Sequence, residues 1–169
     1  MKQTAYRTGD RVVLSPYGLG IVCGTCKRHV AGEARTYYQV DFPETGHCAF
    51  VPVAHPDHAG LRAALTPAQL PALLDILKGR RGSPLHLPQQ WSARRRRVAE
   101  ILGQGHPHEL ATLAGELHRW NIRRALPDLD RQAFKQALHR LEQEVIGLED
   151  QAALAVRQFL QDARAGLNS

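Results

Sequence analysis

The 169-residue sequence has no apolar run that approaches the roughly 18 residues of a membrane-spanning helix. Its start, Met1 to Arg7, carries charge but no apolar stretch behind it, so we expect no signal peptide, no membrane partner and a cytoplasmic location. There are only three cysteines, and an odd number favours reduced thiols over a disulfide framework.

The patterns of known catalytic sites are also missing. The nine histidines are scattered without a His-Glu-x-x-His pattern, no glycine-rich loop is followed by Lys and Ser or Thr, and no serine lies in a nucleophile elbow. Asp128 and Asp130 are better explained as helix caps. We therefore predict a binding protein that is not an enzyme and needs no cofactor.

Acidic residues are absent between Asp75 and Glu100. The formal net charge of the chain is +6, and the seven cations of this window leave the remainder close to neutral. A concentrated basic cluster is typical of a protein that binds nucleic acid, although a run of charge is also often a solvated helix face. The seven cations are Lys78, Arg80, Arg81, Arg94, Arg95, Arg96 and Arg97.

Two different patterns divide the chain. Short β-prone segments separated by Gly- and Pro-rich turns predict four or five strands, hence a strongly bent sheet or a small SH3-like β-barrel. Helical spacing of apolar residues then predicts an all-α domain. The fold class is α+β, with a β domain at residues 1–56 and a helical domain at residues 57–169. The predicted strands are 11–14, 21–30, 36–42 and 48–53, and the predicted helices are about 66–78, 89–102, 108–125, 129–146 and 149–165.

The second predicted helix places Trp91 beside the four arginines 94–97. Pro88 favours an extended chain before it, so Trp91 is expected in the first turn, where free amides attract anions. At about 100° per residue, Trp91, Arg94 and Arg95 share a face. Such an aromatic wedge can unstack or buttress a base while the cations hold the backbone. The alternative is that Trp91 is a core residue, as the leucine stripe around Trp120 predicts for that residue.

Four side chains offer a potential zinc site: Cys23, Cys26, His47 and Cys48. In one continuous strand, however, Cys23 and Cys26 would point to opposite faces, and so would His47 and Cys48. We therefore expect no bound metal, and free thiols that pack like small apolar residues.

Six short motifs follow one another in an order that resembles the CarD/CdnL family of bacterial RNA polymerase-binding transcription regulators, in its Deinococcus–Thermus form. The resemblance extends over about residues 8–165, and its strand part is similar to the Tudor-like domain shared with the transcription-repair coupling factor. The motifs are Gly9-Asp-x-Val-Val-x-x-Pro-x-Gly-x-Gly, Tyr37-Tyr-Gln-Val-Asp-Phe, Val51-Pro-Val, Leu87-Pro-x-x-Trp-x-x-Arg-x-Arg, Gly105-x-x-x-Glu-Leu-x-x-x-Ala and Leu126-Pro-Asp-Leu-Asp-Arg.

The resemblance implies that the β module docks on the β subunit of RNA polymerase through positions matched by Arg28, Phe50 and Pro52. It implies that the helical domain reaches promoter DNA at the upstream edge of the melted bubble, where Trp91 is the wedge and Arg94 and Arg96 match basic positions that hold phosphates. With Arg95 and Arg97 of the same basic run, they are the expected DNA-binding cations. We expect a monomer, associated with the nucleoid through polymerase. Two alternatives stay open: a sequence-nonspecific architectural DNA-binding protein that acts without polymerase, and a zinc-stabilised adaptor without DNA function.

Overall fold

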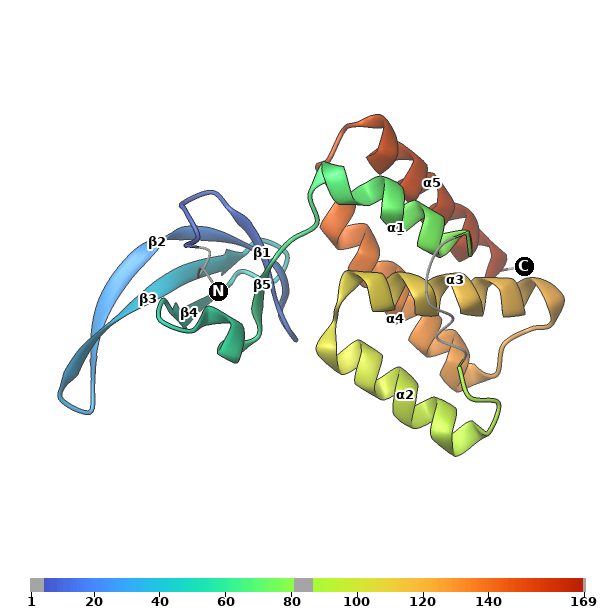
Figure 1. Ribbon diagram of the computed structural model, residues 1–169, viewed down its shortest axis with the longest axis horizontal. Coiled ribbons are helices and arrows are strands. Elements are labelled where there is room, and N and C mark those ends of the chain that lie inside the picture. Colours follow the sequence, from blue (N-terminus) through green and yellow to red (C-terminus); the bar gives the residue numbers. More distant parts are fainter. Residues whose placement is uncertain (1–4, 81–86, 169) are drawn as a thin grey trace. The chain divides into compact units, whose positions relative to one another are not determined.

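The computed structural model describes residues 5–80 and 87–168, and the chain divides between Ala64 and Leu65 into two compact units (Figure 1). The first unit is a β sheet and the second is helical, so the predicted order of a β module and a helical domain is confirmed. This division lies beyond the boundary expected at residues 56–57. A short 3-10 helix and one more strand follow residue 56 in the sequence, and both belong to the first unit. Arg81, Gly82 and Pro84 of the predicted interhelical loop lie outside the described residues.

The described part of the first unit is a five-stranded antiparallel sheet with the order β4-β3-β2-β1-β5 (Figure 1). Its apolar side chains alternate along the strands, as period-two burial requires, and form a core of their own. β5 has only three residues, which is too short for alternation to be read from the sequence. The strands are β1 (Arg11–Leu14), β2 (Gly18–Val30), β3 (Glu33–Phe42), β4 (His47–Pro52) and β5 (Leu61–Ala63), and the 3-10 helix η1 (Pro56–Ala59) lies before β5.

The described part of the second unit contains five α-helices, as predicted. Before the first of them, Thr66 and Gln69 form a reciprocal capping box over the short 3-10 helix η2 (Pro67–Gln69). The helices are α1 (Leu70–Leu77), α2 (Trp91–Gln104), α3 (Pro107–Arg123), α4 (Asp128–Val145) and α5 (Gln151–Gly166).

The core of the helical unit is built from the leucine stripes of α1, α3, α4 and α5. α1 ends so close to α3 that a side chain at Gly115 would place its Cβ 2.5 Å from the carbonyl oxygen of Leu77. Arg119 donates a hydrogen bond to that same carbonyl over 3.1 Å. The glycine is therefore required by packing, because α1 can approach α3 this closely only where α3 has no side chain.

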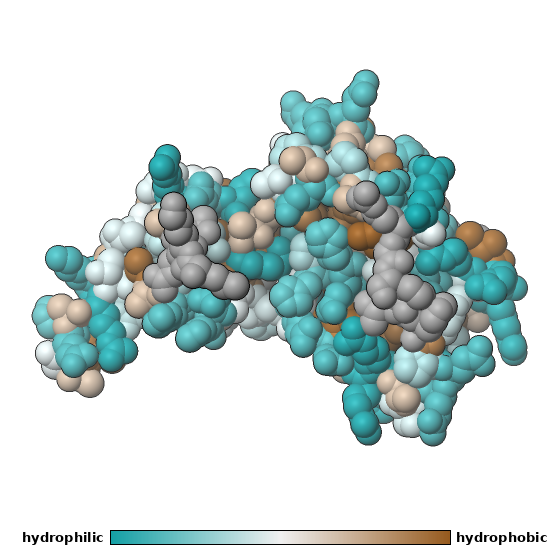
Figure 2. All heavy atoms as spheres, in the orientation of Figure 1, coloured by the Kyte–Doolittle hydropathy of each residue, from teal (hydrophilic) through white to brown (hydrophobic). Residues whose placement is uncertain are grey.

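On the face drawn in Figure 2 the surface is mostly hydrophilic, and hydrophobic side chains appear in small separate patches. This agrees with the burial of apolar side chains in two separate hydrophobic cores. None of the helices in residues 5–80 and 87–168 is long and apolar enough to cross a membrane.

The ring of His118 on α3 packs between the rings of Phe134 on α4 and Phe159 on α5, at centroid distances of 6.3 and 5.2 Å. Its Nδ1 is buried and has no hydrogen-bond partner among the described residues. Burial lowers the pKa of His118; the neighbouring positive charge of Arg119 acts in the same direction and Asp162 opposes it.

Because the folded pKa of His118 lies below the unfolded value of about 6.5, its contribution to stability is present above that pH and is lost as the pH falls through it. We expect the free energy of unfolding in urea to fall between pH 7.5 and pH 5, and His118→Gln to make this fall smaller. His108→Gln, at an exposed position of the same helix, is the control. An equal pH dependence in both variants would contradict the assignment.

Candidate nucleic-acid interface

Trp91 is the first residue of α2, as the sequence predicts. Gln90 before it is extended, with φ −64° and ψ 124°, so the chain enters the helix as expected after Pro88. Trp91 is 50% exposed and is therefore not a core residue. Trp120, in contrast, packs against the helical core, as the leucine stripe around it predicts.

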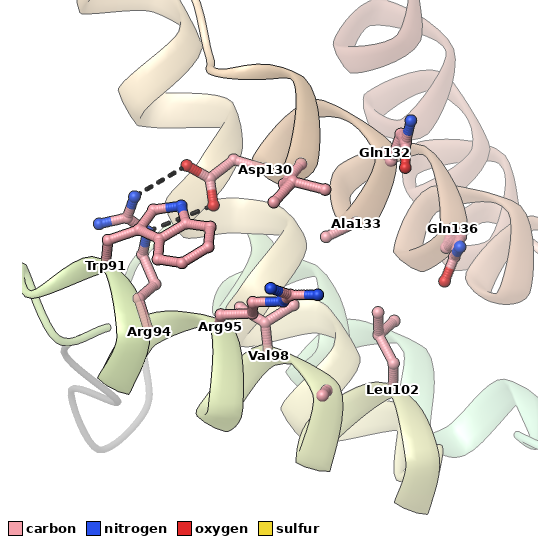
Figure 3. Close-up of a pocket in the computed structure, with 11 residues that line it drawn as sticks. Trp91, Arg94, Arg95, Val98, Leu102, Asp130, Gln132, Ala133 and Gln136 are labelled. Atoms are coloured by element: carbon pink, nitrogen blue, oxygen red, sulfur yellow. Dashed lines mark hydrogen bonds and ion pairs between the residues drawn. The ribbon is translucent and has the colours of Figure 1, made fainter.

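Arg94 is engaged inside the helical unit. Its Nε and Nη2 bind the two carboxylate oxygens of Asp130 over 3.2 and 3.1 Å, and its Nη1 donates to the carbonyl of Gln89 over 3.0 Å (Figure 3). The side chains of the two charged partners are only 12% and 10% exposed. A bidentate, nearly buried pair of this kind fixes both partners in one geometry. Arg94 therefore joins α2 to α4 and does not present its charge at the surface.

The helix-capping role expected for Asp130 is wrong. It is the third residue of α4, and its carboxylate binds Arg94 instead of capping the helix. The side chain of Asp128 does not cap α4 either, because the N-cap is Pro127 and no side-chain capping bond is formed there. The helix that does have an aspartate cap is α5, where Asp150 accepts a hydrogen bond from the amide of Ala153 over 2.9 Å.

The other three arginines of the run differ in whether they form ion pairs. Arg97 pairs with Glu100 over 2.9 Å and with Glu109 of α3 over 3.4 Å. Arg95 and Arg96 are exposed and form no ion pair with any described residue. The guanidinium of Arg95 lies 5.4 Å from the centre of the Trp91 ring. The four consecutive arginines thus comprise two that form ion pairs within the helical unit and two whose charge is exposed at the surface.

Two further cations were not singled out from the sequence. Arg123 and Arg124, at the end of α3, are exposed and line a surface hollow together with Gln89, which lies two residues before Trp91. They lie beyond Glu100 and outside the acid-free window, so charge counting along the chain did not connect them with α2. Their only local signal in the sequence is that two adjacent basic residues precede Pro127, at the end of a predicted helix.

In the β module the structure brings Arg28, Phe50 and Pro52 to one face of the sheet. The guanidinium of Arg28 on β2 lies 3.7 Å from the centre of the Phe50 ring on β4, across the intervening β3. Phe50 and Pro52 are two residues apart on β4 and therefore point the same way. Phe50 is 37% exposed, so this cation–π pair forms an exposed surface feature.

The thiols do not pack as predicted. A β-bulge in β2 makes Cys23 an extra residue between Val22 and Gly24, and both Cys23 and Cys48 are exposed. The Sγ of Cys23 donates to the Asp41 carboxylate over 2.9 Å, and this hydrogen bond raises the pKa of the thiol. β2 is one continuous strand, as assumed, but the bulge interrupts the regular alternation of faces on which the expectation for Cys23 and Cys26 rested.

Residues that could hold a metal gather elsewhere. Among the described residues, the side chains of His55, Asp57 and His58 place their candidate ligand atoms within 4.8 Å of one another. All three are exposed at η1, where the two imidazole rings stack with centroids 4.8 Å apart. The set considered from the sequence, of three cysteines and His47, is not brought together as such a group.

Comparison with protein families gives two matches that together cover most of the chain. Residues 6–64 match the CarD-like/TRCF RID domain, and residues 72–161 match the CarD C-terminal domain. No curated protein matches the sequence.

The division of the arginines leads to a test with Arg94→Ala and Arg96→Ala. We expect the first substitution to lower the free energy of unfolding by roughly 3 kcal/mol, because it leaves a nearly buried carboxylate without its partner. The second should change stability by less than about 0.5 kcal/mol. It should instead lower affinity for DNA and reduce the salt slope by about 0.9 for one lost phosphate contact. Urea melts and DNA titrations at several salt concentrations measure these effects; equal behaviour of the two variants would contradict the division.

Proposed function

We propose, from the premise that the chain belongs to the CarD/CdnL family of bacterial RNA polymerase-binding transcription regulators, that it stabilises the open promoter complex. The β module docks on the β subunit, and the helical unit contacts promoter DNA at the upstream edge of the bubble. The observation that carries the proposal is the exposed indole of Trp91 at the start of α2, with the guanidinium of Arg95 5.4 Å from its ring centre. Arg96, the next residue of the helix, is exposed as well.

The DNA contact has two physical components. Arg95 and Arg96 hold phosphates, which gives affinity without reading sequence. Trp91 acts on a base step that is already kinked or open, because an aromatic side chain can enter only where the bases are unstacked. A ligand shifts an equilibrium only by its difference in affinity for the two states, so the indole favours the open state and the cations favour both. Arg94 and Arg97 contribute indirectly by fixing α2 on its neighbours.

The polymerase contact is assigned to the face that contains Arg28, Phe50 and Pro52. β4, which contributes two of these residues, is one edge strand of the sheet, and a strand edge can pair with a strand of a partner. The ring of Phe50 holds the guanidinium of Arg28 in place, so the charge is presented in a restricted orientation.

Attachment to polymerase explains how a small basic surface is sufficient. Once the β module is bound, contact with DNA is intramolecular, and a weak interaction becomes effective through a high local concentration. The isolated chain is then expected to bind DNA weakly and with strong salt dependence. A sequence-nonspecific architectural DNA-binding protein needs no polymerase-binding face. The two proposed functions therefore differ in whether the effect on DNA requires RNA polymerase.

Trp91→Ala tests the wedge. We expect the open complex to decay roughly five- to a hundredfold faster, because stacking on an aromatic side chain contributes about 1–3 kcal/mol per base. Polymerase affinity and the melting temperature should change little, because the side chain is half exposed. Decay after a heparin challenge is the measurement, and Ile122→Ala, at a 71% exposed apolar position of α3, is the control. Unchanged decay in a folded Trp91→Ala protein would remove the wedge.

Arg28→Glu tests the division of labour between the two units. We expect at least about a tenfold loss of affinity for RNA polymerase, because a charge that faces a partner is reversed. Binding to free DNA should stay within about twofold, because the basic surface of α2 is untouched. Lys27→Glu makes the same change of charge on the opposite face of β2 and is the matched control. Equal loss of polymerase and DNA binding in Arg28→Glu would favour the architectural protein.

A further inference from the structure

A surface hollow of about 160 Å³ lies between α2 and α4, directly beside Trp91 (Figure 3). Small side chains create it: Ala99 on α2 and Ala133 on α4 both line the hollow. Larger residues at these two positions would fill the space between the helices, so the gap follows from the sequence.

The lining of the hollow is apolar with a polar border. Val98 and Leu102 contribute apolar surface from α2. Gln132 and Gln136 line it from α4, one helical turn apart, and both are exposed. Arg95 also lines it and lies against the indole, so a positive charge is next to the opening. An apolar hollow with a few polar groups at its border is the usual form of a ligand site.

We propose that this hollow receives one unpaired pyrimidine base of the melted DNA strand. The inference rests on the proposed function, which brings single-stranded DNA to Trp91. A cavity of about 150 Å³ is known to hold a benzene ring, so a single six-membered ring fits here and a purine does not. The base stacks on the indole, its phosphate is held by Arg95, and its polar edge faces the amides of Gln132 and Gln136, which can both donate and accept hydrogen bonds.

This site adds a property that a wedge alone does not have. A wedge separates bases without regard to their identity, whereas a hollow of limited size distinguishes the base that enters it. A pyrimidine at that position is then bound more tightly than a purine, whereas stacking on the indole alone is tolerant of base identity. A phosphate contact shows no such preference either, because it does not read bases.

The test uses the full chain with a DNA duplex that contains an internal bubble, in which each unpaired nucleotide next to the junction is replaced in turn by an abasic unit. For the wild-type chain we expect one abasic position to lower affinity by roughly tenfold, the equivalent of one stacked base. A 2-aminopurine placed at that position should bind less tightly than a pyrimidine.

Ala99→Leu fills the hollow from an exposed position of α2, and Gln136→Phe fills it from α4. Both variants should lose the preference for a pyrimidine at that position and keep the salt slope of binding. Gln104→Leu adds the same side chain as Ala99→Leu at an exposed position of α2 outside the hollow and should behave as the wild type.

The outcomes separate the two proposals. If the wild-type chain bound the bubble without preferring a pyrimidine to a purine at that position, or if both filled variants kept that preference, the hollow would be rejected and the proposed function would stand. If the chain did not bind the bubble, alone or with RNA polymerase, the proposed function and the hollow would both be rejected.

Discussion

The ion pair between Arg94 and Asp130 determines how the surface around Trp91 is built. α2 is weakly held by apolar contacts, because only two of its described side chains, Val98 and Ile101, are buried. Burial of two such side chains contributes a few kcal/mol at most. The helix is therefore positioned mainly by polar ties: Arg94 to α4, Arg97 to α3, and a hydrogen bond from Arg140 to the carbonyl of Leu102. The tie of Arg94 to Asp130 lies in the first turn of α2, next to Trp91, whose indole is half exposed and accessible.

The two compact units each have a hydrophobic core of their own, and this makes a separation of functions physically reasonable. The sheet exposes a guanidinium held over a phenylalanine ring, and the helices expose an indole with the guanidinium of Arg95 beside it. Both surfaces combine an aromatic ring with arginine, but they differ in geometry. In the sheet the guanidinium lies 3.7 Å from the ring centre, whereas that of Arg95 lies 5.4 Å from the centre of the Trp91 ring.

Much of this architecture could be predicted from the sequence, because long apolar stripes and strand alternation report directly on burial. The five helices, four of the strands and the family were predicted correctly. The short strand β5 was missed, since three residues carry no period. The partner of Arg94 was also missed, because a contact between residues 36 positions apart depends on packing of α2 against α4 and has no local signal. The same holds for the contact between Arg28 and Phe50 and for the hollow, which form only when neighbouring elements are in place.

The four arginines of α2 are the same residue type, but their positions differ in which substitutions they would tolerate during evolution. Lysine keeps the charge of arginine but presents it as a single point, whereas the planar guanidinium reaches both oxygens of a carboxylate at once. At Arg95 and Arg96, where only charge at the surface is required, exchange between arginine and lysine conserves the property that matters. At Arg94 the two hydrogen bonds to Asp130 require the planar guanidinium group, so substitution at that position is constrained as strictly as at a core residue. A comparison of related chains that scores arginine and lysine as equivalent would therefore overlook the position that holds the helix in place.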